Sequence, residues 1–313
     1  MTRRRTFLET AGVVGSTVAV AGCLGLGGEP FNDGEIDFNV SPSVPQEDLE
    51  VQYSPIREFL SEEFDRTTKM NLADNYSAVI EALGSGTTDI AETGPLAAAL
   101  GVNDDSAEII LQRKGYGTWT YKSIIAVRTD SDVEEVADIE GKSVAFSDPL
   151  STSGALYPLY NISQAGVDIG NLPEGNGSEA VFDAVFAGGH VSAYEQLVQG
   201  QVEAAGMGGF VRDTAAGPST EGFEEDARTL AESTGLPRAP IVVSPELSED
   251  RTETLQQAFV DAPQEIYWGA DGEEGTDDDI WFDDVRESDV EEYQSVVDVA
   301  TELGVGTGVF ESN

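Results

Sequence analysis

Residues 147–154 read Ser-Asp-Pro-Leu-Ser-Thr-Ser-Gly, and this stretch decides how the rest of the chain is interpreted. An apolar run at 143–146, typical of a buried strand, precedes it, and an apolar helical pattern begins at residue 154. We therefore expect a loop that leads into a helix N-terminus, where backbone N–H groups lack partners and the helix dipole is positive. Such an end can hold an oxyanion. The sequence predicts an anion-binding cradle with the hydroxyl donors Ser151, Thr152 and Ser153.

Ordinary helix capping is the alternative interpretation of these hydroxyl residues. Ser and Thr are common N-caps, and one such side chain is enough for a cap. Three hydroxyl residues in a row followed by Gly154 favour the cradle. Capping alone remains the open alternative.

Strand and helix patterns alternate along the chain. Strand patterns occur at 36–40, 69–73, 89–91, 109–111, 123–127, 143–146, 181–186, 203–206 and 240–243. Helical patterns occur at 49–64, 76–83, 95–100, 154–165, 191–199, 249–261 and 288–303. This order predicts an α/β fold with mainly parallel sheets. In such sheets ligands bind outside the carboxyl ends of the strands.

The first 34 residues predict export and anchoring. Arg4 and Arg5 begin a twin-arginine pattern, and the apolar core at 10–21 is shorter than the ~20 residues of a membrane-spanning helix. Cys23, the only cysteine of the chain, ends a segment that resembles a lipobox. We expect a twin-arginine lipoprotein signal at 1–22 and a lipid-anchored tether at 23–34, which places the protein on the outer face of the cytoplasmic membrane.

The composition is strongly acidic. The chain has 59 Asp and Glu against 16 Lys and Arg, with a net charge of −43. Molar salt screens such self-repulsion because its Debye length is only ~3 Å. The composition resembles that of proteins from salt-accumulating halophiles, and it argues against nucleic-acid binding. An acidic segment at 269–284 lacks the spacing of a calcium loop and is interpreted as a solvated loop.

A series of short motifs resembles the phosphate/phosphite/phosphonate-binding proteins (PhnD-like) of ABC importers. The motifs lie in the same order and spacing, at 75–76, 91–95, 121–123, 147–154, 188–190 and 236–240. The resemblance implies a two-lobe periplasmic-binding-protein (type II) fold, with parallel sheets flanked by helices and a ligand cleft between the lobes. It places lobe one at 36–127 plus 244–313 and lobe two at 128–243, with the crossovers as the hinge.

The resemblance also implies three further ligand-binding residues. Tyr76 can donate its hydroxyl to an anion, although a packing role for its ring stays open. Thr93 stands where the family often has an aromatic residue, and it keeps one hydroxyl donor. His190, the only histidine, can donate to an oxyanion as imidazole or imidazolium, and its protonation is expected to add a charge-assisted bond.

Other positions depart from the family pattern. Phe210 and Ala239 replace the carboxylates that accept the ammonium of an aminoalkylphosphonate in relatives, so a ligand without a cationic end is expected. Glu92 lies beside the site and is interpreted as a lobe-closing or solvent-facing group. Arg238 is the nearest candidate cation, at the rim of the site.

These observations predict the solute-binding subunit of an ABC importer that captures a phosphorus oxyanion, phosphonate, phosphite or phosphate, by lobe closure. Its expected partners are the oxyanion, the permease and ATPase subunits, and the membrane through the lipid anchor, with the protein itself monomeric. A binding protein that serves a membrane sensor is the alternative, and an enzyme on the same fold is a third reading. The sequence offers no catalytic set, and we expect no cofactor and no metal.

Overall fold

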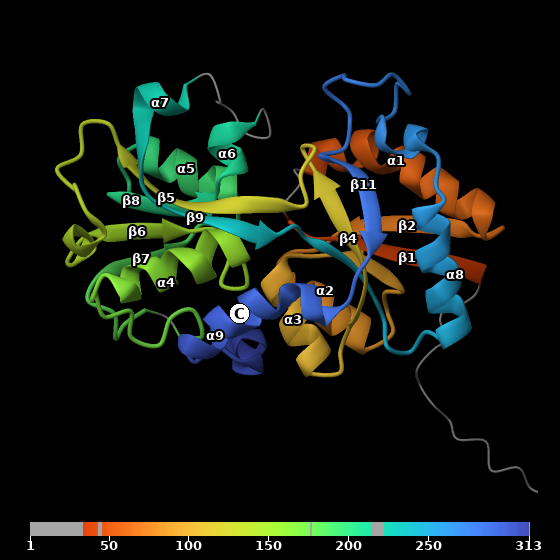
Figure 1. Cartoon of the computed structure of the whole chain (residues 1–313), viewed down its shortest axis with the longest axis horizontal. Coiled ribbons are helices and arrows are strands. Elements are labelled where there is room, and N and C mark those ends of the chain that lie inside the picture. The colour runs from red at the N-terminus through yellow and green to blue at the C-terminus, as the bar shows by residue number, and fades with distance from the viewer. Residues whose placement is uncertain (1–33, 43–45, 176, 215–221, 313) are drawn as a thin grey trace, which may run out of the picture.

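The structure, a computed structural model, describes residues 34–42, 46–175, 177–214 and 222–312. It consists of two α/β halves side by side, each built around one sheet (Figure 1). The first half contains the six-stranded sheet and the second half the five-stranded sheet. Within the described residues, no helix is both long and apolar enough to cross a membrane.

The sheet of the first half has the strand order β11-β4-β10-β3-β1-β2. Strands β1, β2 and β3 are parallel, whereas β10 is antiparallel to β3 and β4, and β11 is antiparallel to β4. The sheet is therefore mixed, with its parallel part where the alternating pattern predicts it. The bounds are β1 Glu35–Val40, β2 Thr67–Leu72, β3 Ile90–Glu92, β4 Glu108–Gly115, β10 Pro240–Val243 and β11 Phe282–Glu287.

The sheet of the second half has the order β7-β6-β8-β5-β9. Strand β6 is parallel to β7 and β8, and β5 is antiparallel to β8 and β9. This sheet is also mixed, because β5, the strand that enters the second half, runs against the other four strands. The bounds are β5 Thr120–Arg128, β6 Ser143–Phe146, β7 Asp183–Phe186, β8 Ala204–Gly208 and β9 Ala227–Pro237.

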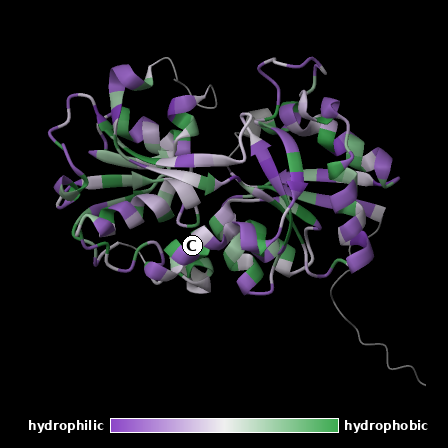
Figure 2. Cartoon of the chain, in the orientation of Figure 1, coloured by the Kyte–Doolittle hydropathy of each residue, from purple (hydrophilic) through white to green (hydrophobic). Residues whose placement is uncertain are grey.

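Helices cover the faces of both sheets because their apolar sides repeat at helical spacing. In α1, Tyr53, Ile56 and Leu60 are fully buried against the first sheet. Figure 2 shows hydrophobic residues gathered inside each half and hydrophilic ones on the outer loops. The helix bounds are α1 Gln46–Glu63, α2 Tyr76–Gly84, α3 Pro95–Asn103, α4 Tyr157–Gln164, α5 His190–Val198, α6 Phe210–Asp213, α7 Phe223–Asp226, α8 Glu249–Val260 and α9 Gln294–Glu302.

The chain passes between the sheets at two neighbouring connections, from β4 to β5 at 115–120 and from β9 to β10 at 237–240. The amide of Arg238 donates to the carbonyl of Trp119 at 3.0 Å and thereby ties the connections together. The lobe boundaries expected at 127/128 and 243/244 are therefore each one strand too late. Strand β5 pairs with β8 and β9 in the second sheet, and β10 pairs with β3 and β4 in the first.

The C-terminal segment joins the halves on one side. Helix α9 packs on α3, in a cluster that also contains residues of α2 and, from the second half, Leu150 and Leu156. Polar contacts add to this packing: the side chain of Gln164 donates to Glu302 at 2.9 Å. Figure 1 shows α9 between α4 and α2. The residues that bracket the predicted cradle are thus part of a core shared by both halves.

Candidate functional site

The predicted cradle forms between strand β6 and helix α4. Ser151 is the N-cap of the π-helical turn η3 (Thr152–Leu156), and its Oγ accepts the amide of Gly154 at 3.0 Å. Gly154 is required here, because a Cβ at this position would lie 2.1 Å from the Oγ of Ser147. All three cradle hydroxyl residues, Ser151, Thr152 and Ser153, are buried. Their placement at a helix start is confirmed by the structure; whether they bind a ligand stays a prediction.

Thr152 and Asp148 contact helix N-termini of the first half. Thr152 Oγ1 accepts the amide of Leu96, near the start of α3, at 2.8 Å. The Asp148 carboxylate accepts the amide of Leu150 at 2.8 Å and also a hydrogen bond from the amide of Tyr76, the first residue of α2. Burial raises the pKa of Asp148, and these two hydrogen bonds partly oppose the rise. The cradle loop is therefore held between the halves.

Tyr121 lies at the site, although the sequence motif at 121–123 does not by itself identify it as a ligand-binding residue. It lies on β5, and its hydroxyl is hydrogen-bonded with the side chains of Ser153 and Thr152. Burial raises the pKa of Tyr121 to about 12, while those hydrogen bonds and Arg238 oppose the rise. The phenol therefore stays protonated and can donate. Its place within the motif at 121–123 was the only signal in the sequence.

His190 begins helix α5 and closes the cradle from the other side. Its Nδ1 accepts the amide of Gly208 at 2.9 Å, so this nitrogen carries no proton. Its Nε2 then carries the proton and lies 3.4 Å from the Oγ of Ser151. Burial lowers the pKa of His190 to about 4. Burial therefore favours the neutral imidazole of the two expected forms as the donor, and a charge-assisted bond from the protonated ring stays a prediction.

Ser147 and His190 form a serine–histidine pair that the sequence did not reveal. Ser147 Oγ lies 3.0 Å from His190 Nδ1. The same Nδ1 already accepts the Gly208 amide, and Ser147 is packed under Gly154. A nucleophile needs a free basic nitrogen and open access to a reacting atom. This pair has neither, and it orients the imidazole instead.

Tyr76 and Thr93, the ligand-binding residues expected from the first half, lie at the start of α2 and just before α3, and their contact with a ligand stays a prediction. The Tyr76 ring packs so closely on Gly94 that a Cβ there would lie 2.9 Å from it, and burial raises the pKa of the phenol above its usual range. Thr93 is 1% exposed, and its Oγ1 has no hydrogen-bond partner among the described residues. A buried hydroxyl without a partner is costly, so Thr93 has capacity left for a ligand.

Glu92 differs from its expected role. It is fully buried and forms an ion pair with Arg113, which lies over the rings of Trp281 and Phe282. The interpretation as a solvent-facing or lobe-closing group is therefore wrong. Local sequence patterns could not show this pair, because β10 separates the strands that carry the two residues.

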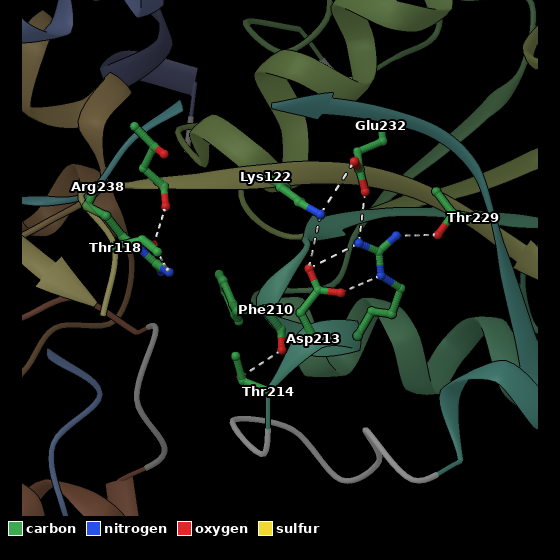
Figure 3. Close-up of polar contacts among 10 residues, drawn as sticks. Thr118, Lys122, Phe210, Asp213, Thr214, Thr229, Glu232 and Arg238 are labelled. Carbon is green, nitrogen blue, oxygen red and sulfur yellow. Dashed lines mark hydrogen bonds and ion pairs between the residues drawn. The ribbon is translucent and has the colours of Figure 1, made fainter. Parts of the chain in front are cut away.

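Phe210 and Arg238 both lie beside the ring of Tyr121. The Phe210 ring packs edge-on against His190 at 4.9 Å between centroids and lies 6.5 Å from the Tyr121 ring. Arg238 is buried rather than at an exposed rim, with its guanidinium 5.4 Å from the centre of the Tyr121 ring. Figure 3 shows Phe210 on α6 facing the connection that carries Arg238.

Helix N-termini supply the electrostatics of the site. Tyr76, Leu96, Thr152 and His190 each lie in the first turn of a helix or helical turn, and hydrogen bonds link these ends around the cradle. Each end carries about half a positive charge. An oxyanion can thus bind here without Lys or Arg in the cradle. Within the described residues, His, Cys, Asp and Glu form no group of three that could hold a metal ion.

Comparisons with known proteins agree with this geometry. A family described as "ABC transporter, phosphonate, periplasmic substrate-binding protein" matches residues 38–293. The chain is 32% identical over 182 residues to the phosphate-import protein PhnD of Mycolicibacterium smegmatis, a match to 55% of this chain and 53% of that protein. It is 24% identical over 230 residues to the phosphonates-binding periplasmic protein of Escherichia coli, covering 72% and 65%. The matches therefore span about half to two thirds of these relatives.

Two solved structures share the fold. One is a binding protein component of an ABC phosphonate transporter from Pseudomonas aeruginosa, with TM-score 0.69, 18% identity, and coverage of 88% of this chain and 87% of that one. The other is PhnD1 from Prochlorococcus marinus in complex with methylphosphonate, with TM-score 0.70, 16% identity, and coverage of 87% and 99%. At this identity the likeness concerns the fold alone.

The two-sheet architecture and its matches define a type II periplasmic-binding fold, which confirms the expected fold class. The family match covers most of the chain. The chain belongs to the periplasmic phosphonate substrate-binding proteins of ABC transporters.

Proposed function

We propose that this protein is the extracytoplasmic solute-binding subunit of an ABC importer and that it captures a phosphorus oxyanion between its two halves. One observation carries the proposal. Four helix N-termini, the cradle hydroxyls and the neutral imidazole of His190 meet in one buried place. The hydroxyls and the imidazole are donors for the oxygens of a phosphate, phosphite or phosphonate. The helix ends add positive potential, while the amides of Tyr76 and Leu96 already bond to Asp148 and Thr152. The phosphonate-binding family, a similar phosphate-import protein and a similar structure in complex with methylphosphonate support the same class of ligand.

A direct binding measurement tests this function. Calorimetry of the purified protein in molar NaCl should detect binding of phosphate, phosphite or methylphosphonate. An amino acid such as arginine serves as the control. Its carboxylate lies next to an ammonium group, which the cradle does not accommodate. The proposal fails if none of the three phosphorus oxyanions binds at millimolar concentration.

Closure of the halves over the ligand is part of the proposal. The hinge would lie in the two connections at 115–120 and 237–240, where the chain passes between the sheets. Leu150 and Leu156 of the second half are already fully buried in one cluster with residues of α2, α3 and α9, so this structure corresponds to the closed arrangement. Small-angle scattering should show a smaller radius of gyration with saturating methylphosphonate. An unchanged radius under saturation would contradict closure.

Anchoring and partners complete the proposed role. The twin-arginine signal, Cys23 and the tether at 23–34 lie outside the described residues, apart from residue 34, and support an exported lipoprotein. Mass spectrometry of the membrane-extracted protein should find an acylated Cys23 at the mature N-terminus. We propose that the permease and ATPase of an importer are its partners and that the molecule acts as a monomer. Uptake of the ligand by cells that lack these subunits would favour a different partner.

The acidic surface supports a protein that works in concentrated salt. Several acidic side chains of the 269–284 loop bond within the loop itself: the amides of Asp271 and Gly275 donate to Asp278 and Asp279. Most of this loop is exposed. These features favour the interpretation as a solvated loop.

A further inference from the structure

Arg238 occupies an unusual place in the molecule. It lies in the connection between β9 and β10, where the chain leaves the second half, and its side chain is 7% exposed. Burial lowers its pKa from the usual value, yet a guanidinium keeps its charge at any physiological pH. A permanent positive charge is therefore buried beside the proposed ligand site.

The donors of Arg238 are largely unused. Its Nε has no hydrogen-bond partner among the described residues, and its Nη2 makes one long contact of 3.5 Å with Thr118 Oγ1. None of the ion pairs of the described residues includes it. Asp283, the carboxylate that affects its pKa, is half exposed and lies 3.8 Å from Lys114 instead.

Other buried or stacked arginines of the chain are satisfied. Arg113 pairs with Glu92 and donates its Nε to the carbonyl of Ala239. Arg286 lies over the Trp119 ring and pairs with Glu292 at 2.7 Å. Arg238 has the aromatic surroundings of these residues but not their anion.

Three aromatic rings hold the Arg238 guanidinium in place. Tyr116, Tyr121 and Trp281 have ring centres 5.3, 5.4 and 5.9 Å from its Cζ. Ring faces stabilise the charge but leave the N–H groups free, since these point within the guanidinium plane. Arginine forms two parallel hydrogen bonds to a carboxylate, so a planar anion fits the unused donors.

Tyr121 relates Arg238 to the cradle. Its hydroxyl bonds with Ser153 and Thr152, whereas the face of its ring lies beside Arg238. The cradle therefore contacts the hydroxyl of Tyr121, whereas the guanidinium of Arg238 lies over the ring of the same residue. Phe210, whose ring is stacked with the Tyr121 ring at 6.5 Å between centroids, is an uncharged neighbour of the same side chain.

We propose that Arg238 determines ligand specificity by binding a second acidic group, a carboxylate, on a phosphonate whose phosphorus end lies in the cradle. The inference rests on the proposed function, which places the phosphorus oxyanion at the Ser151–Ser153 hydroxyls. The ligand class is a small carboxyalkylphosphonate. Tyr121 donates to the phosphorus end, and Arg238 selects the other end.

Calorimetry in molar NaCl with phosphonoacetate and methylphosphonate tests this inference. We expect phosphonoacetate to bind at least tenfold more tightly than methylphosphonate. Equal or weaker binding of phosphonoacetate overturns the inference but leaves the proposed function intact. Absence of binding by both ligands, and by phosphate and phosphite, overturns both.

Variants assign the effect to the side chain. Arg238→Gln should lower phosphonoacetate affinity at least tenfold and methylphosphonate affinity less than threefold. Arg238→Lys keeps the charge without the planar fork and should lose at least threefold for phosphonoacetate, which decides the matter if the glutamine variant does not fold. Arg286→Gln removes another stacked arginine and should change neither affinity. Equal losses for both ligands in the Arg238 variants would place Arg238 on the phosphorus group and overturn the inference.

Discussion

The hydroxyl oxygen of Thr152 accepts the amide hydrogen of Leu96 at 2.8 Å, although the two residues belong to different halves of the molecule. Leu96 lies in the first turn of α3, whose N-cap is Gly94, a residue without a capping side chain. Thr152 therefore supplies from the second half the cap that the first half lacks. Because the oxygen accepts from Leu96, its own hydrogen remains available as a donor. The same side chain can thus join the halves and contact a ligand.

We first predict that Thr152→Val weakens binding of the preferred phosphorus oxyanion by about 1–3 kcal/mol, because the valine neither caps α3 nor donates. Thr152→Ser keeps the hydroxyl and should bind within about threefold of the wild type. Calorimetry gives the affinities, and scattering shows whether the valine variant is more open. Wild-type affinity in the valine variant would contradict the role of Thr152.

The second prediction concerns Ser153 and Tyr121. Ser153→Ala and Tyr121→Phe should each lower ligand affinity by about 1–3 kcal/mol, the range for a hydrogen bond to a charged group. The two residues share a hydrogen bond, so the double variant should lose less than the sum of the single losses. Tyr160→Phe, a change outside the site, serves as the control. Additive losses would show that the two hydroxyls act independently.

Sequence patterns predicted the elements that are buried and local. Strand β6 occupies the predicted residues, and α2 begins after Asn75, whose side chain accepts the amide of Ala78 as expected of a cap. Strands β9 and β11 were missed. Both are edge strands, and their many polar residues hide the strand pattern. Edge strands pair on one side only, so their sequences need less apolar character.

The candidate site was predictable only in part for a similar reason. The cradle hydroxyls form one continuous motif, so a helix start and its donors could be identified from the sequence. Tyr121, Arg238 and the Glu92–Arg113 pair depend on how the two connections bring distant segments together. Partners that lie on different strands leave no local pattern in one sequence.

The third prediction concerns His190 and pH. Its folded pKa of about 4 lies below its ordinary value of 6.5, so the unfolded chain takes up a proton first as the pH falls. The stability that this group contributes is complete above pH 6.5 and is lost between 6.5 and 4. Between pH 7 and 5 the free energy of unfolding should fall by about 2 kcal/mol more in the wild type than in His190→Gln. Urea denaturation of both proteins in molar NaCl measures this difference, and equal falls would contradict the buried neutral ring.

The fourth prediction concerns salt. The net charge of −43 implies strong self-repulsion, which molar salt screens. We expect the melting temperature to rise by at least about 5 °C between 0.1 M and molar KCl, or roughly 1–2 kcal/mol. Sucrose of equal osmolality serves as the control, because it does not screen charge. A melting temperature that is constant or falls with KCl would contradict the proposed adaptation to salt.

The last prediction concerns a ligand with a cationic end. Phe210 and Ala239 are uncharged, Glu92 is neutralised by Arg113, and the buried charge beside Tyr121 is the positive Arg238. An ammonium there would lose its water without gaining a partner and would be repelled by the guanidinium.

We therefore expect 2-aminoethylphosphonate to bind at least tenfold more weakly than ethylphosphonate, a difference of about 1.4 kcal/mol. Ethylphosphonate is the matched control because it has the same carbon chain and lacks only the ammonium. Calorimetry in molar NaCl measures both. Tighter binding of the amino compound would mean that a carboxylate accepts the ammonium. Glu92, whose Oε1 has no hydrogen-bond partner among the described residues, would then be that acceptor. In that case Glu92→Gln should abolish the preference, since an amide carries no charge to pair with the ammonium.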